Sequence, residues 1–274
     1  DMVSRVKELG MSAIAVTDHG NMYGAIKFYK ECVLQGIKPI IGAEIYMAKR
    51  SRLDKEAGID SDSNHLILLA KDFNGYKNLM KIISAAGLEG YYYKPRADIE
   101  LLQKYHEGLI CLSACVNGFV TEPLLKNQDK IAQERAIQLS QIFGKDNFYL
   151  ELQKHTHVPD QDTANPKLIE LSQKLGIPLV ATNDNHYVKP DDAEGQEALL
   201  CIQTQTFMAD KDRKLSMIDS PDFYIKSPEE MTGLFIQTPE AITNTVKIAE
   251  MCNLEISIGK WIMPIFDVPG GKPP

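Results

Sequence analysis

The feature that most constrains the fold of this chain is the alternation of short apolar runs with helical patterns. Runs rich in β-forming residues occur at 12–17, 38–47, 65–70, 108–113, 148–153 and 177–182. Apolar residues at helical spacing fill much of the remaining chain, at 2–9, 24–35, 75–86, 128–142, 165–175 and 238–252. Strands that alternate with helices are typical of βα units. The sequence therefore predicts an α/β protein with a largely parallel sheet.

Chain length and the positions of polar and Pro- or Gly-rich segments limit the domain organisation. The 274 residues can bury the core of one large α/β barrel or of two smaller domains. Polar segments at 49–63 and 208–222 predict exposed loops, and the tip of a long β-hairpin is the less favoured alternative for the first. The Pro- and Gly-rich ending at 264–274 is typical of a linker. The chain opens inside a helix that no strand precedes, which suggests an excised fragment.

Composition narrows the class of protein further. No apolar stretch approaches the ~20 residues of a membrane span, and no basic-then-apolar signal pattern is present, so we expect a cytoplasmic protein without membrane contact. The five cysteines are few, and most lie in apolar segments, which predicts free thiols. A formal net charge of −7 gives no basic surface for wrapping nucleic acid. Any polynucleotide contact must be local, or helped by a metal or a larger assembly.

Polar residues follow the first apolar run and interrupt the second. Asp18 and His19 come directly after the run at 12–17, where parallel α/β folds place their sites, although turn chemistry explains a single pair equally well. Glu44 lies within a run otherwise suited to burial. A buried carboxylate needs a cation or good donors, and a salt bridge to Lys or Arg is the commoner solution. Each of these residues alone leaves both readings open.

Later runs add further candidates. His65 begins the run at 65–70, and Cys115 follows the run at 108–113, but a strand-edge histidine and a packed cysteine are the ordinary readings. We place Cys111 in the core. Glu151 alternates with its neighbours so that it could face a site, whereas His155 and His157 fall beyond the strand, where a solvated loop pair is favoured over ligands.

The segment "ATNDNHY" at 181–187 is the strongest candidate for a site. Asp184 and His186 stand two residues apart, on one side of an extended segment that follows an apolar run. A barrel brings the ends of its strands together around one mouth. The recurrence of Glu, Cys, His and Asp at these ends therefore argues against a separate structural explanation for each residue. Carboxylate, imidazole and thiolate are ligands of zinc and manganese. The pattern predicts a metal cluster suited to hydrolysing a phosphoryl group.

Several longer segments carry a family resemblance, among them "AVTDHGNMYGAIKFYKE", "GIKPIIGAEIYMA", "HLILLAKDFNGYKNLMKIIS", "YKPRADIELL", "EGLICLSAC" and "PLVATNDNHY". At these segments the chain closely resembles the PHP (polymerase and histidinol phosphatase) domains of bacterial replicative DNA polymerase III α subunits. The resemblance implies a distorted (β/α)7 barrel over residues 1–263, here without its first strand, and a linker at 264–274 toward a polymerase palm domain.

The resemblance also implies a divalent metal cluster, of zinc or manganese, at the mouth of the barrel. The ligand positions that carry over are His19, Glu44, His65, Cys115, Asp184 and His186, and Asp18 resembles a residue that orients the site. Asp18, His19, Asp184 and His186 are the catalytic candidates. The family's first motif, HxH on the first strand, has no counterpart after Asp1, which predicts an incomplete site and impaired activity in the fragment.

The family implies two functions, and the retained ligand positions His19, Glu44, Cys115 and His186 favour the first. One is a metal-dependent phosphoesterase that acts as a 3′–5′ proofreading exonuclease on a DNA 3′ end; nucleotidyl transfer would belong to palm residues beyond Pro274. The other is a non-catalytic scaffold that stabilises the polymerase and docks a proofreading exonuclease subunit. A phosphatase of the histidinol phosphate type is disfavoured, because free-standing PHP phosphatases lack segments such as "FNGYKNL".

Overall fold

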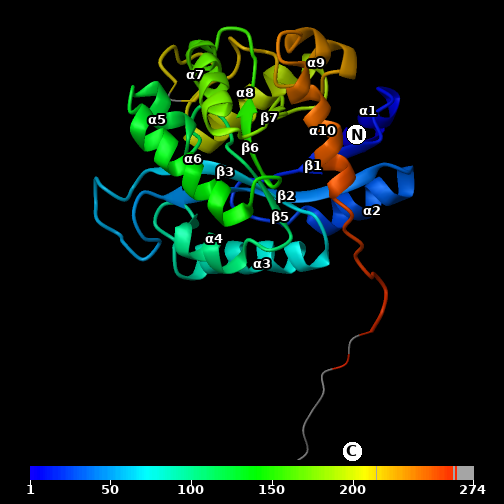
Figure 1. Cartoon of the computed structure of the whole chain (residues 1–274). Coiled ribbons are helices and arrows are strands. Elements are labelled where there is room, and N and C mark those ends of the chain that lie inside the picture. The colour runs from blue at the N-terminus through cyan, green and yellow to red at the C-terminus, as the bar shows by residue number, and fades with distance from the viewer. Residues whose placement is uncertain (214, 262, 264–274) are drawn as a thin grey trace, which may run out of the picture.

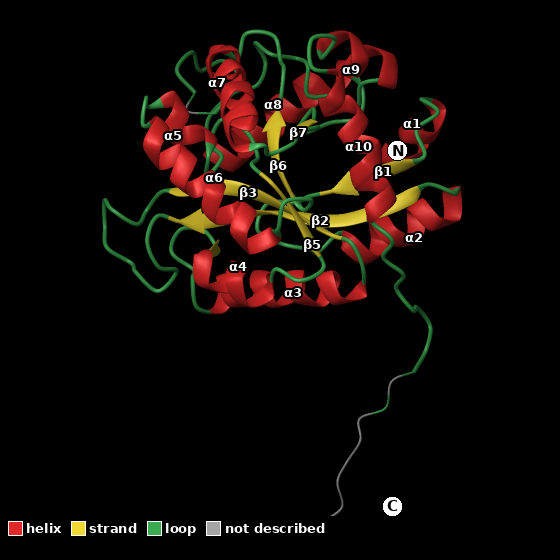
Figure 2. Cartoon of the chain, in the orientation of Figure 1, coloured by secondary structure: helices red, strands yellow, loops and turns green. Residues whose placement is uncertain are grey.

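A curled sheet forms the centre of the chain in the computed structural model, which describes residues 1–213, 215–261 and 263 (Figures 1 and 2). Its strands are β1 (Ala13–Val16), β2 (Lys38–Ala48), β3 (Ser63–Ala70), β4 (Arg96–Ala97), β5 (Leu109–Leu112), β6 (Phe148–Leu152) and β7 (Leu179–Ala181). The strand order is β1-β2-β3-β5-β6-β7, and β4 pairs with β2 off this path. Each of the six predicted apolar runs forms a strand.

One strand runs against the others. β3 is antiparallel to both β2 and β5, whereas β1, β5, β6 and β7 all run in the direction of β2. The expectation of a largely parallel sheet is confirmed, and the polar segment after β2 is the connection of a hairpin. Because β3 is reversed, its first residues lie at the same edge of the sheet as the carboxyl ends of its neighbours.

Helices connect the strands and cover the outside of the sheet (Figure 1). They are α1 (Met2–Glu8), α2 (Ala25–Gln35), α3 (Phe73–Leu88), α4 (Ile99–Tyr105), α5 (Thr121–Leu125), α6 (Asp129–Phe143), α7 (Pro159–Leu175), α8 (Ala193–Thr204), α9 (Pro228–Leu234) and α10 (Pro239–Met251), with a 3-10 turn at Pro190–Asp192. None of the helices in the described part of the chain is long and apolar enough to cross a bilayer.

Local chemistry accounts for several helix ends. The Asp72 carboxylate accepts a hydrogen bond from the Gly75 backbone N–H at 2.8 Å and so begins α3. Gly36 ends α2 directly after the predicted helical pattern at 24–35, because its φ of 74° lies in the left-handed region that glycine adopts without strain. The start of α7 is earlier than the predicted residue 165, since Pro159 and two aspartates make a polar first turn that apolar periodicity does not reveal. The sequence also did not predict α4, α5, α8 or α9.

Side chains alternate between two apolar clusters, one on each face of the sheet. The larger cluster takes Ile41, Ala43 and Ile45 of β2 and packs under helices α2, α3 and α6. The smaller cluster takes the alternate residues, such as Ile40 of β2 and Tyr149 of β6, and packs against Ile248 and Cys252 near the end of α10. Because side chains of a strand alternate, Glu44 lies on the same face as the smaller cluster. That face is the inside of the curl.

Helix α10 spans the open side of this curl. The Asn244 side-chain amide donates to the Leu179 carbonyl of β7 at 2.7 Å, and the Lys38 ammonium at the start of β2 donates to Asn253 Oδ1 at 2.8 Å. Among the described residues, β1 and β7 are the edge strands and do not pair with each other. The architecture is therefore an incompletely closed, distorted barrel of the TIM-like α/β type, as expected. The predicted linker at 264–274 lies outside the described residues.

Candidate metal centre

Two of the predicted ligands come from the hairpin of β2 and β3. Tyr46 stands opposite His65 in the register of this hairpin, and Glu44 stands opposite Ile67, so Glu44 and His65 are diagonal neighbours on one face. His65 Nδ1 lies 2.5 Å from Glu44 Oε1. The Glu44 residue is 6% exposed, and the His65 side chain is partly buried. The pair is therefore built by strand register alone.

The end of β1 brings a third predicted ligand to this pair. His19 forms a parallel bridge with Glu44, in which the Gly20 N–H donates to the Glu44 carbonyl at 2.8 Å and the Glu44 N–H donates to the Asp18 carbonyl at 3.1 Å. His19 Nδ1 then lies 3.7 Å from Glu44 Oε2. Gly20 is required here, because its φ is 65° and a Cβ would lie 2.8 Å from Pro95 Cγ.

The end of β7 approaches from the other edge of the sheet. Asp184 has a left-handed φ of 47°, and its carbonyl accepts a hydrogen bond from His186 Nδ1 at 2.7 Å. This bond fixes the tautomer and leaves Nε2 of His186 free to bind an ion. The His186 ring centroid lies 6.5 Å from that of His19. The two edge strands therefore contribute to one site, although they do not pair with each other.

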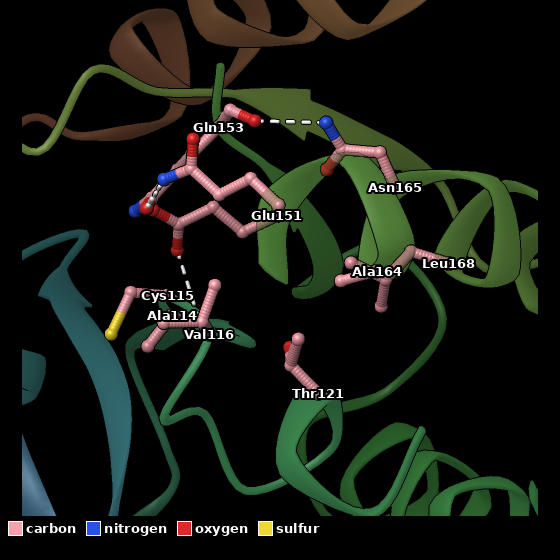
Figure 3. Close-up of a pocket in the computed structure, with 10 residues that line it drawn as sticks. Ala114, Cys115, Val116, Thr121, Glu151, Gln153, Ala164, Asn165 and Leu168 are labelled. Carbon is pink, nitrogen blue, oxygen red and sulfur yellow. Dashed lines mark hydrogen bonds between the residues drawn. The ribbon is translucent and has the colours of Figure 1, made fainter. Parts of the chain in front are cut away.

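Cys115 completes the group from the turn after β5. Its sulfur lies 3.5 Å from His65 Nδ1. The preceding residue, Ala114, has a left-handed φ of 63°, and its N–H donates to the Glu151 carboxylate at 3.0 Å. Figure 3 shows Glu151 directed at this turn, with the Cys115 sulfur pointing away from it. A buried carboxylate thus anchors the turn that carries the thiol.

Burial and neighbouring charges act differently on the three acidic groups. Burial favours the neutral form of Glu44, but the hydrogen bond from His65 and the charges of the surrounding histidines lower its pKa overall. Burial raises the pKa of Asp184. Burial, together with the nearby carboxylates, raises the pKa of the Cys115 thiol well above its usual value. Without a cation, the site therefore holds a proton more readily at Asp184 and Cys115 than at Glu44.

The donor set suits a divalent cation. His19, Glu44 and His65 each offer one ligand atom, and these atoms all lie within 4.8 Å of one another. Two ligands at ~2.1 Å from one ion lie at most ~4.2 Å apart, so small side-chain rotations suffice. In the described part of the chain, the ion-pair partners of Glu44 are histidines rather than Lys or Arg. A buried carboxylate without a permanent positive partner is the arrangement that a metal stabilises.

Comparison with known proteins agrees with this architecture. Residues 1–155 match the PHP domain family, which is more than half of the chain. The chain belongs to the PHP domain family.

Relatives of this PHP domain are subunits of a polymerase. The chain is 49% identical over 271 residues to the DNA polymerase III subunit alpha of Borreliella burgdorferi and 45% identical over 269 residues to that of Treponema pallidum, with 98% of the chain covered in each case. It is 42% identical over 282 residues to the subunit of Thermus aquaticus. The PHP chain spans 23% of the length of each of these relatives.

A solved structure of a protein assigned to the metal-dependent phosphoesterases, from Bifidobacterium adolescentis, was also found. It aligns with 66% of the PHP chain and 79% of its own, at a TM-score of 0.40 and 11% identity.

Two expectations about the PHP site need correction or remain open. His155 is not solvated: it is 5% exposed, stacks on Phe223, and its ring nitrogens face the Asn183 carbonyl at 2.9 Å and the Gln161 side chain. His157 is exposed, as expected. The Asp18 side chain is exposed and makes no hydrogen bond to a histidine ring among the described residues, so its orienting role stays a prediction.

Sequence reasoning missed two features of the PHP site. Tyr46 stacks on His19 with centroids 5.9 Å apart and meets His65 edge-on at 5.4 Å. Its position two residues after Glu44 was the available signal. The carboxylate of Glu151 accepts hydrogen bonds from Gln153 and Thr182 as well as from the Ala114 turn. No local pattern identifies this network, because its members come from three separate strand ends.

Proposed function

We propose that this PHP domain is a divalent-metal-dependent phosphodiesterase that removes nucleotides from DNA 3′ ends, as a 3′–5′ proofreading exonuclease beside a polymerase. The observation that carries the proposal is the convergence of His19, Glu44 and His65 on one point, with Cys115 and His186 adjacent. The similarity to DNA polymerase III α subunits supports DNA as the substrate. Further partners in the proposal are the palm domain, joined through a linker at 264–274, and a primer–template.

We assign the ligand roles in this proposal to His19, Glu44, His65, Cys115, Asp184 and His186, with zinc or manganese as the ion. A bound divalent ion supplies positive charge that stabilises the charge developing on phosphoryl oxygens. The protein contributes fixed geometry. The hairpin holds Glu44 against His65, the Asp184 carbonyl orients the His186 ring, and the Tyr46 ring stacks on the His19 ring. Pre-positioned ligands of this kind reduce the reorganisation needed in the transition state.

Metal content and hydrolysis test the proposal together. We expect the chain to retain zinc or manganese after dialysis, measured by inductively coupled plasma mass spectrometry, and to shorten a 3′-mismatched primer faster than it hydrolyses histidinol phosphate. His186→Ala should lower the rate by more than ~100-fold, because a ligand is lost. His157→Ala is the matched control, since this histidine lies outside the site. Absence of both metals, or equal rates in His186→Ala and wild type, would remove the nuclease from consideration.

A scaffold role is the competing proposal, and exposed apolar side chains favour it. Leu34 and Val33 of α2 are 80% and 56% exposed, and Ile202 of α8 is 75% exposed. Neighbouring exposed apolar side chains such as Leu34 and Val33 are typical of surfaces that contact another protein, whereas single ones such as Ile202 are ordinary. A scaffold predicts that Leu34→Ser weakens association with a polymerase or exonuclease subunit while His186→Ala leaves it unchanged, as measured by analytical ultracentrifugation.

A further inference from the structure

The segment Gly90–Arg96, which we call the tyrosine loop, places three consecutive tyrosines and a lysine next to the candidate metal centre. Tyr91 is 59% exposed and Tyr93 is 67% exposed. Lys94 is also exposed, and it makes no salt bridge among the described residues. Two exposed aromatic rings in one short loop, beside an exposed lysine, offer a ligand both flat apolar faces and a positive charge.

Buried contacts hold the tyrosine loop in one conformation. Arg96 is 0% exposed, and its guanidinium donates to the backbone carbonyls of Gly90, Arg52, Asp54 and Asp60 at 2.8 to 3.1 Å. A Cβ at Gly90 would lie 2.0 Å from the Arg96 carbonyl oxygen, so the two ends of the loop touch. The loop is therefore closed at its base by a residue whose guanidinium uses four of its five N–H donors on backbone carbonyls.

The middle of the loop is also constrained. The Tyr92 N–H donates to the Lys94 carbonyl at 3.0 Å, and Tyr93 has a left-handed φ of 58°. This conformation is unfavourable for a bulky residue and persists only where the surroundings impose it. The Tyr92 and Tyr93 rings meet edge-on at 4.7 Å. The exposed rings are thus presented by a rigid support and not by a free loop.

The support lies directly beside the predicted ligands. Arg96 of β4 pairs in register with Tyr46 of β2. The Lys94 ammonium sits 5.3 Å from the centre of the Tyr46 ring, whose other neighbours are the rings of His19 and His65. Two successive contacts, from Lys94 to Tyr46 and from Tyr46 to either histidine, therefore connect the loop to the predicted ligands. A polymer bound at the metal centre can reach the tyrosines within a few of its units.

We propose that the tyrosine loop is a subsite for the unpaired 3′-terminal nucleotides of single-stranded DNA, with bases stacked on Tyr91 and Tyr93 and a backbone phosphate bound by Lys94. The proposal rests on the nuclease function above and names the form of its substrate. Proteins that bind single strands without sequence preference combine aromatic platforms with nearby cations. Duplex DNA does not offer its base faces to such rings, so the subsite selects frayed or mismatched ends. The formal net charge of the chain is −7, so it offers no general electrostatic attraction to a DNA strand. A single lysine at the subsite therefore contributes more to binding of a phosphate.

Binding of an oligonucleotide that carries or lacks its terminal bases tests this subsite. The probe is a short oligothymidylate labelled at its 5′ end, compared with the same oligonucleotide carrying abasic sites at its last two 3′ positions. Fluorescence anisotropy in the presence of a chelator reports binding without hydrolysis. We expect the full oligonucleotide to bind at least roughly 25-fold more tightly than the abasic one, because stacking of one base on an aromatic ring gives about 5- to 100-fold and two bases are removed.

Variants assign the effect to the rings and to the lysine. Tyr91→Ala/Tyr93→Ala should abolish the preference for the full oligonucleotide, whereas Tyr91→Phe/Tyr93→Phe should keep it, because phenylalanine stacks equally well. Lys94→Ala should lower the dependence of log K on log salt by about 0.7, the contribution of one phosphate on a single strand. Phe73→Ala is the matched control. Phe73 is half exposed with Lys77 over its ring, but it follows β3 at the opposite end of the sheet.

The outcomes separate the subsite from the nuclease. Equal affinity for the full and abasic oligonucleotides, or a preference that survives the double alanine change, overturns the subsite even if the metal-loaded chain hydrolyses DNA; the tyrosines would then belong to a protein contact. A preference that disappears in the double alanine variant, with no hydrolysis by any form of the chain, supports the subsite and overturns the nuclease.

Discussion

Replacing the buried glutamate beneath the Cys115 turn should change how stability depends on pH. Glu151 is 5% exposed, and burial raises its pKa to about 7, although the hydrogen bonds from Thr182 and Gln153 oppose this. The ordinary value is 4.5. The unfolded chain therefore releases this proton at lower pH than the folded chain does. Between about pH 4.5 and 7 the folded state binds more protons, so stability falls as pH rises through this window.

The size of the effect follows from the two pKa values. A shift from 4.5 to about 7 corresponds to about 3 kcal/mol in total, of which about 2.5 kcal/mol falls between pH 5 and pH 8. Glu151→Gln removes the titration. It also alters hydrogen bonds to the carboxylate, but this cost is the same at every pH. The free energy of unfolding of the wild type, minus that of the variant, should therefore fall by about 2.5 kcal/mol from pH 5 to pH 8.

Urea unfolding followed by circular dichroism, with a chelator present at each pH, measures this difference. Glu230→Gln is the control, because the Ser227 backbone N–H and the Tyr224 hydroxyl lower the pKa of Glu230. The free energy of unfolding of the wild type, minus that of Glu230→Gln, should change in the opposite direction. This difference should decrease as pH falls through the acid range. A Glu151 difference that is the same at pH 5 and pH 8 would refute the reasoning that burial keeps this group protonated.

The remaining predictions concern backbone contacts and one loop. Gly75→Ala should destabilise the fold by roughly 1–3 kcal/mol, because its Cβ would lie 1.9 Å from a carbonyl oxygen. Gly87→Ala in the same helix meets nothing within 4 Å and should stabilise it by about 0.5–1 kcal/mol; equal effects in urea unfolding would contradict both. Arg96→Met should cost about 3 kcal/mol or more, because it leaves buried carbonyls without donors, and should expose the β2–β3 connection to limited proteolysis. The Arg50 guanidinium lowers the pKa of Asp60 to about 2. The wild type should therefore be more stable than Asp60→Asn by an amount that is complete above about pH 4 and disappears as pH falls toward 2. A difference in stability that is unchanged at pH 2 in acid unfolding would argue against the ion pair.

Strand positions were predictable because each strand is an apolar run bounded by polar or turn residues. The run at 38–47 corresponds to Lys38–Ala48, and the run at 177–182 contains Leu179–Ala181. The direction of each strand in the sheet was not predictable, because side chains alternate in the same way in parallel and antiparallel strands. The hairpin reading of the 49–63 segment was the only indication that β3 is reversed. Short helices such as α4 were not predicted, because five to seven residues are too few to show a repeating apolar face.

The gathering of His19, Glu44, His65 and His186 at one edge was predictable from their recurrence beside apolar runs, since strands fix where such residues lie. Their roles as ligands stay a prediction. The burial of His155 was not predictable, because its partners Gln161 and Asn183 come from a helix and from the end of another strand. A local sequence pattern does not predict the burial of a residue whose neighbours come from distant parts of the chain.

The β2–β3 hairpin has a consequence for the order in which the site is assembled. Glu44 and His65 belong to a local pair of strands, whereas His186 is made 121 residues after His65. At a synthesis rate of ~5–20 residues per second, the first pair exists for about 6–24 s before the last histidine is translated. Hairpins form in microseconds. We therefore expect a growing chain to present two of its six predicted ligands to the cell's metal ions well before the fold that selects among metals is complete.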